Sequence, residues 1–233
     1  WKWPLWAAAV FVSFFVLVDF VFFAATLTKI VDGGWVPLMI AACSMLVMWT
    51  FVRGNALLAE KTQRDSIPLK DLIPMLEKSR PTRVPGTAIF LTNRLTSAPS
   101  ALLHNIKHNK VLHEQVWLMS VRTEDTPRVS VADRYEVQKL SSDFTIVTLH
   151  FGYMESPRIP DALALLRKSG HTCEIMTTSF FLGRRTIKAS LNSCMPAWQD
   201  GLFIALSKQA IDATEFFSIP SDRVVELGAQ VAI

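Results

Sequence analysis

Charged side chains are scarce at the start of this chain. The first 52 residues carry four of them, Lys2, Asp19, Lys29 and Asp32, whereas the remaining 181 residues carry forty. So few charges suit a hydrocarbon environment, because a charged side chain inside a bilayer is costly. This asymmetry predicts a membrane segment followed by a water-soluble domain.

Cysteine is also rare. The chain has three cysteines, Cys43, Cys173 and Cys194, and none belongs to a C-x-x-C pair. An odd number without close pairs argues against a disulfide framework and against a cysteine-rich zinc site. It is typical of a protein whose soluble part lies in a reducing compartment.

The common catalytic and cofactor motifs are missing as well. The sequence has no G-x-G-x-x-G after a strand, no P-loop lysine and no G-x-S-x-G elbow. We therefore expect no catalytic residues and no cofactor. After residue 52, 22 basic residues face 18 acidic ones, which is an ordinary mixed surface and requires no nucleic acid.

Two long apolar runs dominate the first 53 residues. Residues 5–27 and 35–52 are each long enough to cross a hydrocarbon core of ~30 Å. A short polar turn, residues 28–34, separates them and contains Gly33-Gly34. The pattern predicts a hairpin of two antiparallel transmembrane helices. A secretory signal peptide is the alternative for the first run, but the run exceeds a usual signal core and a second span follows directly.

The positions of basic residues predict the orientation of this hairpin. The turn between the spans contains one, Lys29, whereas the flanking segments contain several: Lys2, Arg53, Lys61, Arg64 and Lys70. Basic residues near the ends of spans favour the cytoplasmic side. Both ends of the hairpin, and everything after residue 53, are therefore expected in the cytoplasm.

The chain starts Trp-Lys-Trp-Pro without an initiator methionine, and two helices alone enclose little. We expect it to be the C-terminal part of a larger membrane protein with further helices upstream.

The soluble part begins with a connector, residues 54–80, that is expected to be helical over 54–61, broken near 66–68 and helical again to about 78. Apolar runs and alternations after Pro81 then predict strands and helices in turn. The expected strands are 88–92, 116–121, 134–140, 144–151, 177–182 and 223–233, the last broken at Gly228, and the expected helices are 99–110, 160–169 and 196–210. This order predicts one α/β domain over residues 81–233 that folds in water without the hairpin.

One helix of this domain carries a histidine pair. His104 and His108 stand four residues apart, so they share a helix face, and two imidazoles at this spacing can bind zinc. The metalloprotease pattern H-E-x-x-H is not completed after His113-Glu114. The apolar stripe of the helix consists of Leu102, Leu103 and Ile106. We therefore assign His104 and His108 to a polar face of unknown role, toward solvent or another subunit, and predict no metal site.

Asp19 is an ionisable residue inside the first span. It lies fourteen residues from the start of the run, or ~20 Å along a helix at ~1.5 Å per residue. A carboxyl group at that depth usually faces a partner or a water-filled cavity. It either handles an ion or proton, or makes a structural hydrogen bond to a neighbouring helix, and the structural role is favoured.

Several stretches of the chain resemble the KUP/HAK/KT family of potassium uptake transporters, in particular its bacterial members. In order, they are DFVFF (19–23), GGWVPL (33–38), RVPGTA (83–88), LLHNIKHNKVLHE (102–114), RTED (122–125), TSFF (178–181) and RVVELG (223–228). The resemblance covers essentially the whole chain, and the histidine block is its most specific part. Thr26 and Ala232 depart from residues common in the family.

The resemblance implies a transporter and not an enzyme. The family has about twelve spans in an inverted-repeat architecture and imports K+ together with H+ across the bacterial cytoplasmic membrane. This chain would supply the last two spans and a cytosolic C-terminal domain, which could form a homodimer. The family's ion site is thought to lie on early spans, so no ion-binding residue is assigned here.

A membrane-anchored regulatory or docking domain without transport activity is the alternative function. A membrane-tethered hydrolase is disfavoured because no catalytic constellation is present. The upstream sequence separates the first two: about ten further spans would favour transport, and a start codon just before Trp1 would favour the anchor.

Overall fold

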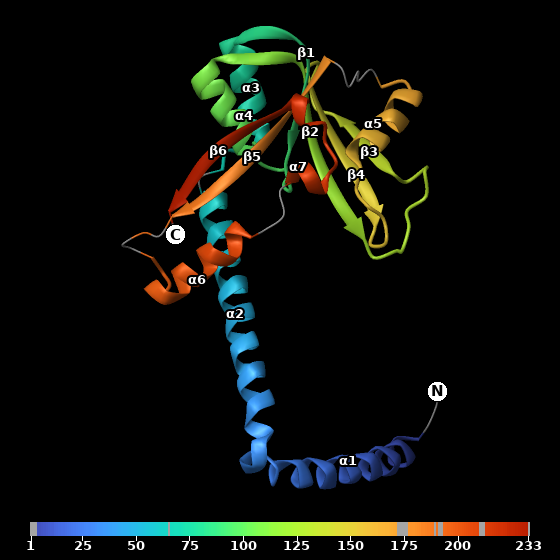
Figure 1. Cartoon of the computed structure of the whole chain (residues 1–233). Helices are drawn as coiled ribbons and strands as arrows, with labels where there is room; N and C mark the ends of the chain where they lie inside the picture. The colour runs from blue at the N-terminus through green and yellow to red at the C-terminus, as the bar shows by residue number, and fades with distance from the viewer. Residues whose placement is uncertain are drawn as a thin grey trace. The chain divides into compact units, whose positions relative to one another are not determined.

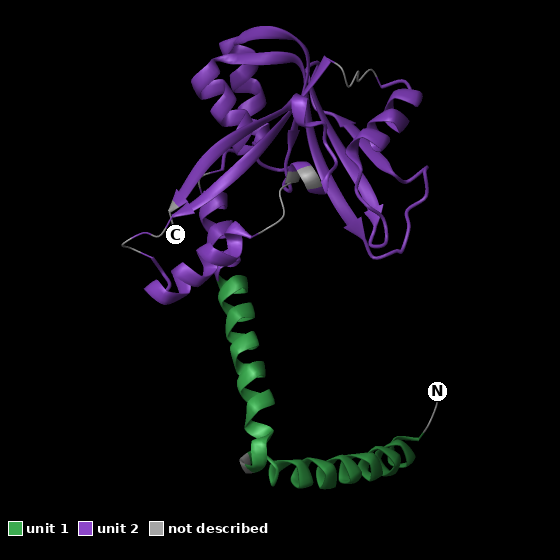
Figure 2. Ribbon diagram, in the orientation of Figure 1, with its two compact units in different colours: residues 1–53 green, residues 54–233 purple. Residues whose placement is uncertain are grey.

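The computed structural model describes residues 4–64, 66–171, 177–188, 190, 193–209 and 213–232. Predictions that involve Trp1, Lys2, Trp3 and Cys173, or the side chain of Ala232, lie outside the described residues. The chain divides into two compact units, residues 1–53 and 54–233 (Figure 2).

The first unit contains the apolar helices that the sequence predicts. Helix α1 spans Leu5–Leu27, a π-helical turn η1 covers Ile30–Gly34, and helix α2 spans Trp35–Arg64. The helix is interrupted at Gly33, whose φ of 118° is readily adopted only by glycine. Both helices are long and apolar enough to cross a membrane. None of the described residues of α1 is buried, so the antiparallel packing of the two spans stays a prediction.

Helix α2 extends well beyond the predicted second span. It continues from Trp35 to Arg64 as one helix, so the helical exit predicted at 54–61 is its C-terminal part. Arg64 pairs with Glu60 one turn earlier at 2.6 Å. The residues from Gly54 onward belong to the second unit.

The second unit is built on a six-stranded sheet in the order β3-β4-β2-β1-β5-β6 (Figure 1). All neighbouring strands are parallel except β3, which pairs with β4 in antiparallel fashion. In chain order the elements are α3 (Leu69–Ser79), β1 (Thr82–Leu91), α4 (Ser100–His104), η2 (Asn105–Asn109), β2 (Val111–Glu124), β3 (Tyr135–Lys139), β4 (Phe144–Gly152), α5 (Ile159–Lys168), β5 (Thr178–Lys188), α6 (Ala197–Lys208), α7 (Ala213–Phe216), η4 (Ser221–Arg223) and β6 (Val224–Ala232). The predicted α/β class is confirmed.

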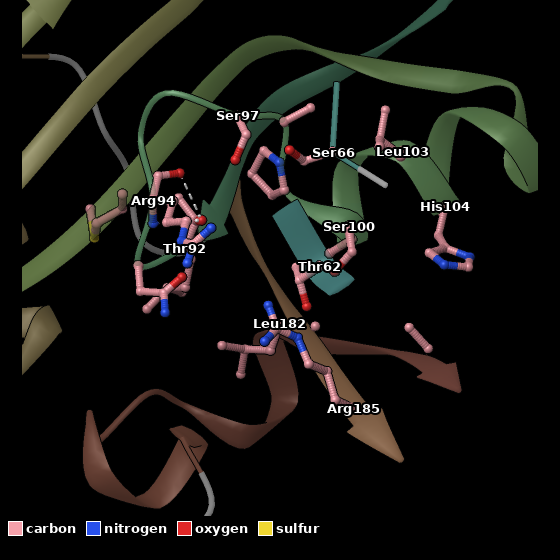
Figure 3. Close-up of a pocket in the computed structure, with 18 of the residues that line it drawn as sticks. Thr62, Ser66, Thr92, Arg94, Ser97, Ser100, Leu103, His104, Leu182 and Arg185 are labelled. Atoms are coloured by element: carbon pink, nitrogen blue, oxygen red, sulfur yellow. Dashed lines mark hydrogen bonds between the residues drawn. The ribbon is translucent and has the colours of Figure 1, made fainter. Parts of the chain in front are cut away.

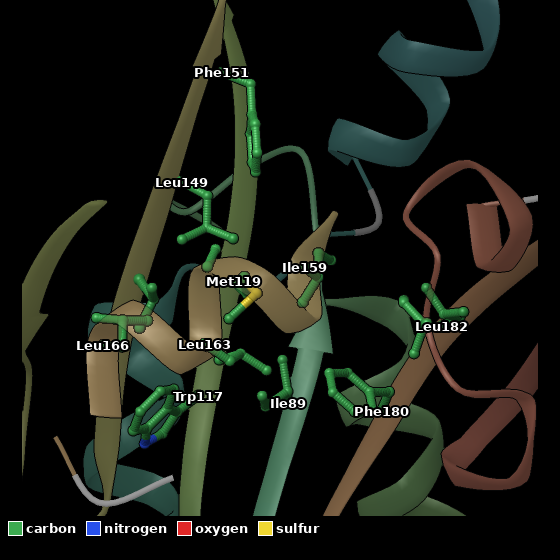
Figure 4. Packing of buried hydrophobic residues seen from close by; sticks show 13 residues of the cluster. Ile89, Trp117, Met119, Leu149, Phe151, Ile159, Leu163, Leu166, Phe180 and Leu182 are labelled. Atoms are coloured by element: carbon green, nitrogen blue, oxygen red, sulfur yellow. The ribbon is translucent and has the colours of Figure 1, made fainter. Parts of the chain in front are cut away.

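Both faces of the sheet are covered, which explains the continuous apolar runs of its central strands. Ile89 faces α5, whose Leu163 and Leu166 pack over Trp117 and Met119 (Figure 4). The opposite face holds a second cluster with the leucines of α3 and α4; its buried members are Leu69, Leu72, Leu76, Ala88, Phe90, Ala98, Ala101, Leu102, Leu112, Val116, Leu118, Phe144 and Phe181. Successive residues of β1 therefore alternate between two cores.

The last strand differs from its prediction in one respect. The sequence predicts a break at Gly228, but β6 runs through this residue, which pairs with Arg184 of β5. Strand pairing uses backbone groups, so a glycine without a side chain does not end it. No atom lies within 4 Å of the missing Cβ, and the position needs no side chain for packing.

The burial of α3 bears on where an independently folding domain begins. Leu69, Leu72 and Leu76 are at most 6% exposed, and each such side chain contributes ~1.5–3 kcal/mol on burial. We expect residues 54–233 to melt cooperatively in water at a clearly higher temperature than residues 81–233, because the shorter chain exposes this core. Circular dichroism melting of the two chains tests this. Equal melting temperatures would contradict a structural role for α3.

Gly54 in α2 packs directly against the ring of Phe203 in α6. A Cβ on the buried residue Gly54 would lie 2.4 Å from a ring carbon of Phe203, which is fully buried. Met195, Leu57 and Ile187 complete this small cluster. The absent side chain is therefore what lets α6 pack on the C-terminal part of α2.

We expect Gly54→Ala to lower the melting temperature of the chain. Alanine favours the helix by up to ~1 kcal/mol, but overpacking a buried ring typically costs ~1–3 kcal/mol. Gly201→Ala in α6 is the matched control, since no atom lies within 4 Å of its Cβ position, and it should be neutral or stabilising. Thermal unfolding of both variants measures the difference; two shifts of the same sign and size would refute the close packing.

A half-buried ion pair fixes the loop between β2 and β3 to the end of β4. Arg134 donates two hydrogen bonds to Glu155, at 2.6 and 2.9 Å. The backbone amides of Gly152 and Val129 also donate to this carboxylate, at 2.7 and 3.2 Å. The bond from Arg134, and then that from Gly152, lower the pKa of Glu155 to about 2.

A depressed carboxyl pKa predicts how stability depends on pH. The contribution of Glu155 is present above its ordinary pKa of 4.5 and is lost as the pH falls from there toward 2. We expect Glu155→Gln to destabilise the chain at pH 7, and the difference from wild type to shrink progressively below pH 4.5. Asp161→Asn, in an exposed pair with Arg158, is the control and should have little effect. Urea unfolding between pH 2.5 and 7 measures both; a difference that is constant with pH would contradict the prediction.

Candidate functional site

Asp19 lies within α1 and has an exposed side chain in this chain. Among the described residues it forms no hydrogen bond and no ion pair. By contrast, the hydroxyl of Thr26 donates to the carbonyl of Phe22 at 2.8 Å, so this polar side chain is satisfied within its own helix. A carboxyl group inside a bilayer usually faces a partner or a water-filled cavity, so the role of Asp19 stays a prediction.

The histidine pair lies at the end of a helical segment formed by α4 and η2. The rings of His104 and His108 are stacked with centroids 5.7 Å apart. His108 is exposed, whereas His104 is half-buried and lines a cleft. Leu102, Leu103 and Ile106 pack into the core as predicted. The described residues contain no group of three His, Cys, Asp or Glu side chains that could hold a metal ion.

The cleft arises from the different lengths of the central strands. Strand β1 ends at Leu91, which pairs with Met119, whereas β2 continues to Glu124 and β5 to Lys188. Beyond β1 the pair β5–β6 diverges from β2 and β4 (Figure 1). A cavity of about 620 Å³ opens there. Its polar lining residues are Thr62, Ser66, Thr92, Asn93, Arg94, Ser97, Ser100, His104 and Arg185.

The cleft lies where the strand order of the sheet reverses, next to β1. From β1 the chain adds β2 and β4 on one side, and then β5 and β6 on the other. In open parallel sheets, ligands bind at the carboxyl ends of the strands where the strand order reverses. The loop that follows β1, residues 92–99, forms one wall of the cleft at this point.

The loop conformation holds Arg94 at the cleft. The Thr92 hydroxyl donates to the Arg94 carbonyl at 3.0 Å and accepts from the Arg94 amide at 3.2 Å. The Arg94 guanidinium also donates to the Gln63 side chain in the last turn of α2, at 3.5 Å. Figure 3 shows Arg185 reaching from β5 toward the same space.

The cleft is electropositive. Neither Arg94 nor Arg185 forms an ion pair with any residue that the structure describes, and no acidic residue is among those that line the cavity. Partial desolvation, and then the positive charge of Arg94, lower the pKa of Arg185. Its neighbour Arg184 instead pairs with Glu226 at 3.1 Å. Two uncompensated guanidiniums next to hydroxyl groups can bind an anion.

Sequence reasoning did not single out Arg94 or Arg185. A weak signal exists, since Thr92-Asn93-Arg94 directly follows a predicted buried strand. Arg185 lies 91 residues later, and only the pairing of β5 with β1 brings it to the same cleft.

Comparison with known proteins covers both units. Residues 1–56 match the family described as the K+ potassium transporter integral membrane domain. Residues 85–233 match the K+ potassium transporter C-terminal domain. No solved structure matches the chain.

Curated relatives match over the whole chain. The probable potassium transport system protein Kup 2 of a Bradyrhizobium species is 52% identical over 99% of this chain and 37% of its own length. The corresponding Kup proteins of Nitrobacter winogradskyi and Caulobacter vibrioides are 52% and 50% identical over all of this chain, and 36% and 35% of their own lengths. The chain thus spans little more than a third of these relatives. Since both of its units match and half of its residues are identical, the chain belongs to the K+ potassium transporter family.

Proposed function

We propose that this chain is the C-terminal part of a potassium uptake transporter that imports K+ together with H+ across the bacterial cytoplasmic membrane. The observation that carries the proposal is the identity of about 50% to potassium transport system proteins over the entire chain. In this function α1 and α2 are the last two spans of a larger helical assembly. Coupling to protons would make the protein a secondary active transporter.

The chain contributes little to the ion path itself. Dehydrated K+ needs several oxygen ligands around it, supplied in transporters by interrupted helices near the middle of the membrane. Helix α1 has one carboxylate, Asp19, and no break within Leu5–Leu27. We therefore place the ion site, and the inverted repeats that would build it, in the upstream part of the protein.

The second unit is proposed to lie in the cytoplasm. Arg53, Lys61, Arg64 and Lys70 follow the second span, whereas the turn between the spans contributes only Lys29. This asymmetry supports a cytoplasmic location. The edge strand β6 leaves backbone groups available for pairing, and we infer that the domain forms a homodimer.

Substitutions of Asp19 test how α1 takes part in transport. We expect it to anchor α1 by a hydrogen bond to an upstream helix, so that Asp19→Asn in the full-length transporter keeps most K+ uptake. Asp19→Leu should lower the amount of folded protein, because an unsatisfied buried partner costs ~1–3 kcal/mol. Uptake at two pH values, normalised to protein in the membrane, measures both.

The matched control is Asp32→Asn in the turn between the spans, which should change neither uptake nor protein amount. An Asp19→Asn protein that reaches the membrane normally but loses pH-dependent uptake would contradict the anchor and indicate proton transfer. This chain alone should not restore growth of a K+-uptake-deficient strain on low K+. Full-length protein that also fails to restore growth would contradict the proposed function itself.

A further inference from the structure

We propose that the cleft beyond β1 binds a small phosphate-bearing molecule with an apolar group, of about the size of a nucleoside monophosphate, and that this binding acts on the C-terminal end of α2. The consequence for transport rests on the function proposed above, whereas the binding does not.

The charge of the cleft selects an anion. Arg94 and Arg185 line the same cavity, and among the described residues neither guanidinium is neutralised by a carboxylate. Thr92 orders the Arg94 backbone through its hydroxyl group, so the cation is partly pre-positioned. Guanidinium groups bind phosphate oxygens through paired, charge-assisted hydrogen bonds.

Hydroxyl groups extend the polar part of the site. Ser97 and Ser100 lie on the loop and at the start of α4, on the wall that Arg185 faces (Figure 3). Each can donate to a phosphate oxygen that the arginines leave free. The polar part of the cleft thus matches one phosphoryl group.

The remaining walls of the cleft are apolar and indicate an apolar group on the ligand beside its phosphate. They are apolar side chains from four strands and from the segment before β6: Leu91, Met119, Val121, Leu182, Phe217, Ala229 and Val231. Inorganic phosphate would leave this surface in contact with water. A cavity of about 620 Å³ lies within the range of sites for small organic ligands. An aromatic or other flat apolar group joined to the phosphate fits both parts.

The site also includes the end of α2. Thr62 lines the cleft, and Gln63 accepts a hydrogen bond from Arg94 at 3.5 Å. A phosphate is a stronger acceptor for this guanidinium than an amide oxygen. Binding would therefore replace the contact of Arg94 with Gln63. Because α2 runs as one helix from Trp35 to Arg64, this contact lies on the same helix that contains the second span.

Binding is tested on the purified chain in detergent, by isothermal titration with AMP and with inorganic phosphate. We expect AMP to bind more tightly than phosphate, because only AMP covers the apolar walls. Arg94→Gln and Arg185→Gln should each weaken AMP binding about tenfold or more, the usual loss for a hydrogen bond to a charged group. Arg185→Lys should lose less, since the positive charge is kept.

Arg184→Gln is the matched control, because its side chain pairs with Glu226 and does not line the cleft. It should leave AMP binding within about twofold of wild type. Melting of the ligand-free variants must be unchanged, so that lost binding is not lost folding. Absence of binding of both probes at millimolar concentration, or equal weakening in Arg184→Gln and Arg185→Gln, would overturn the site. Phosphate binding as tightly as AMP would overturn the assignment of the apolar group.

The action on α2 is tested in the full-length transporter reconstituted into vesicles. AMP on the face that carries the second unit should change the rate of K+ uptake, and Arg185→Gln should abolish that change while keeping uptake without AMP. AMP that binds the protein but leaves uptake unaltered would overturn the link to α2. Absence of any K+ uptake would instead count against the proposed function, and the titration decides the binding site independently.

Discussion

The early end of the central strand β1 is the constraint on which the second unit depends. Strand β1 has neighbours on both sides and contributes Ala88, Ile89 and Phe90, all fully buried, to the cores on the two faces of the sheet. It stops at Leu91 while β2 and β5 continue. The same strand therefore joins the two cores and leaves the space in which loop 92–99 and the arginines lie. A longer β1 would close the sheet and remove the cleft.

Most of the fold could be predicted from local patterns. Low charge and two apolar runs indicated α1 and α2, and short apolar segments between polar turns indicated the strands and helices of the second unit. The exception at Gly228 shows the limit of residue propensities. A glycine weakens a strand through entropy, but the parallel ladder from Phe180–Val224 to Lys188–Ala232 overrides that preference. Tertiary pairing decides such positions.

The cleft could not be predicted in the same way. Its two arginines come from separate parts of the chain and meet because β5 lies next to β1 and not beyond β4. Strand order is a property of the assembled sheet, and the apolar pattern of each strand is compatible with several orders. Asp19 and the pair His104 and His108 were visible because each stands out within a single helix. Local chemistry is readable from the sequence, whereas a site assembled from distant strands is not.

The continuity of α2 also fixes how its length can vary. An α-helix turns by ~100° per residue, so inserting one residue between Gly54 and Thr62 would rotate Thr62 and Gln63 relative to Gly54 about the helix axis. Gly54 could then stay against the ring of Phe203 only if Thr62 left the cleft and Gln63 left Arg94. Insertions that keep the rotational phase need about seven residues, or two turns. Relatives with this domain should therefore conserve the number of residues between Gly54 and Thr62 more strictly than their identity.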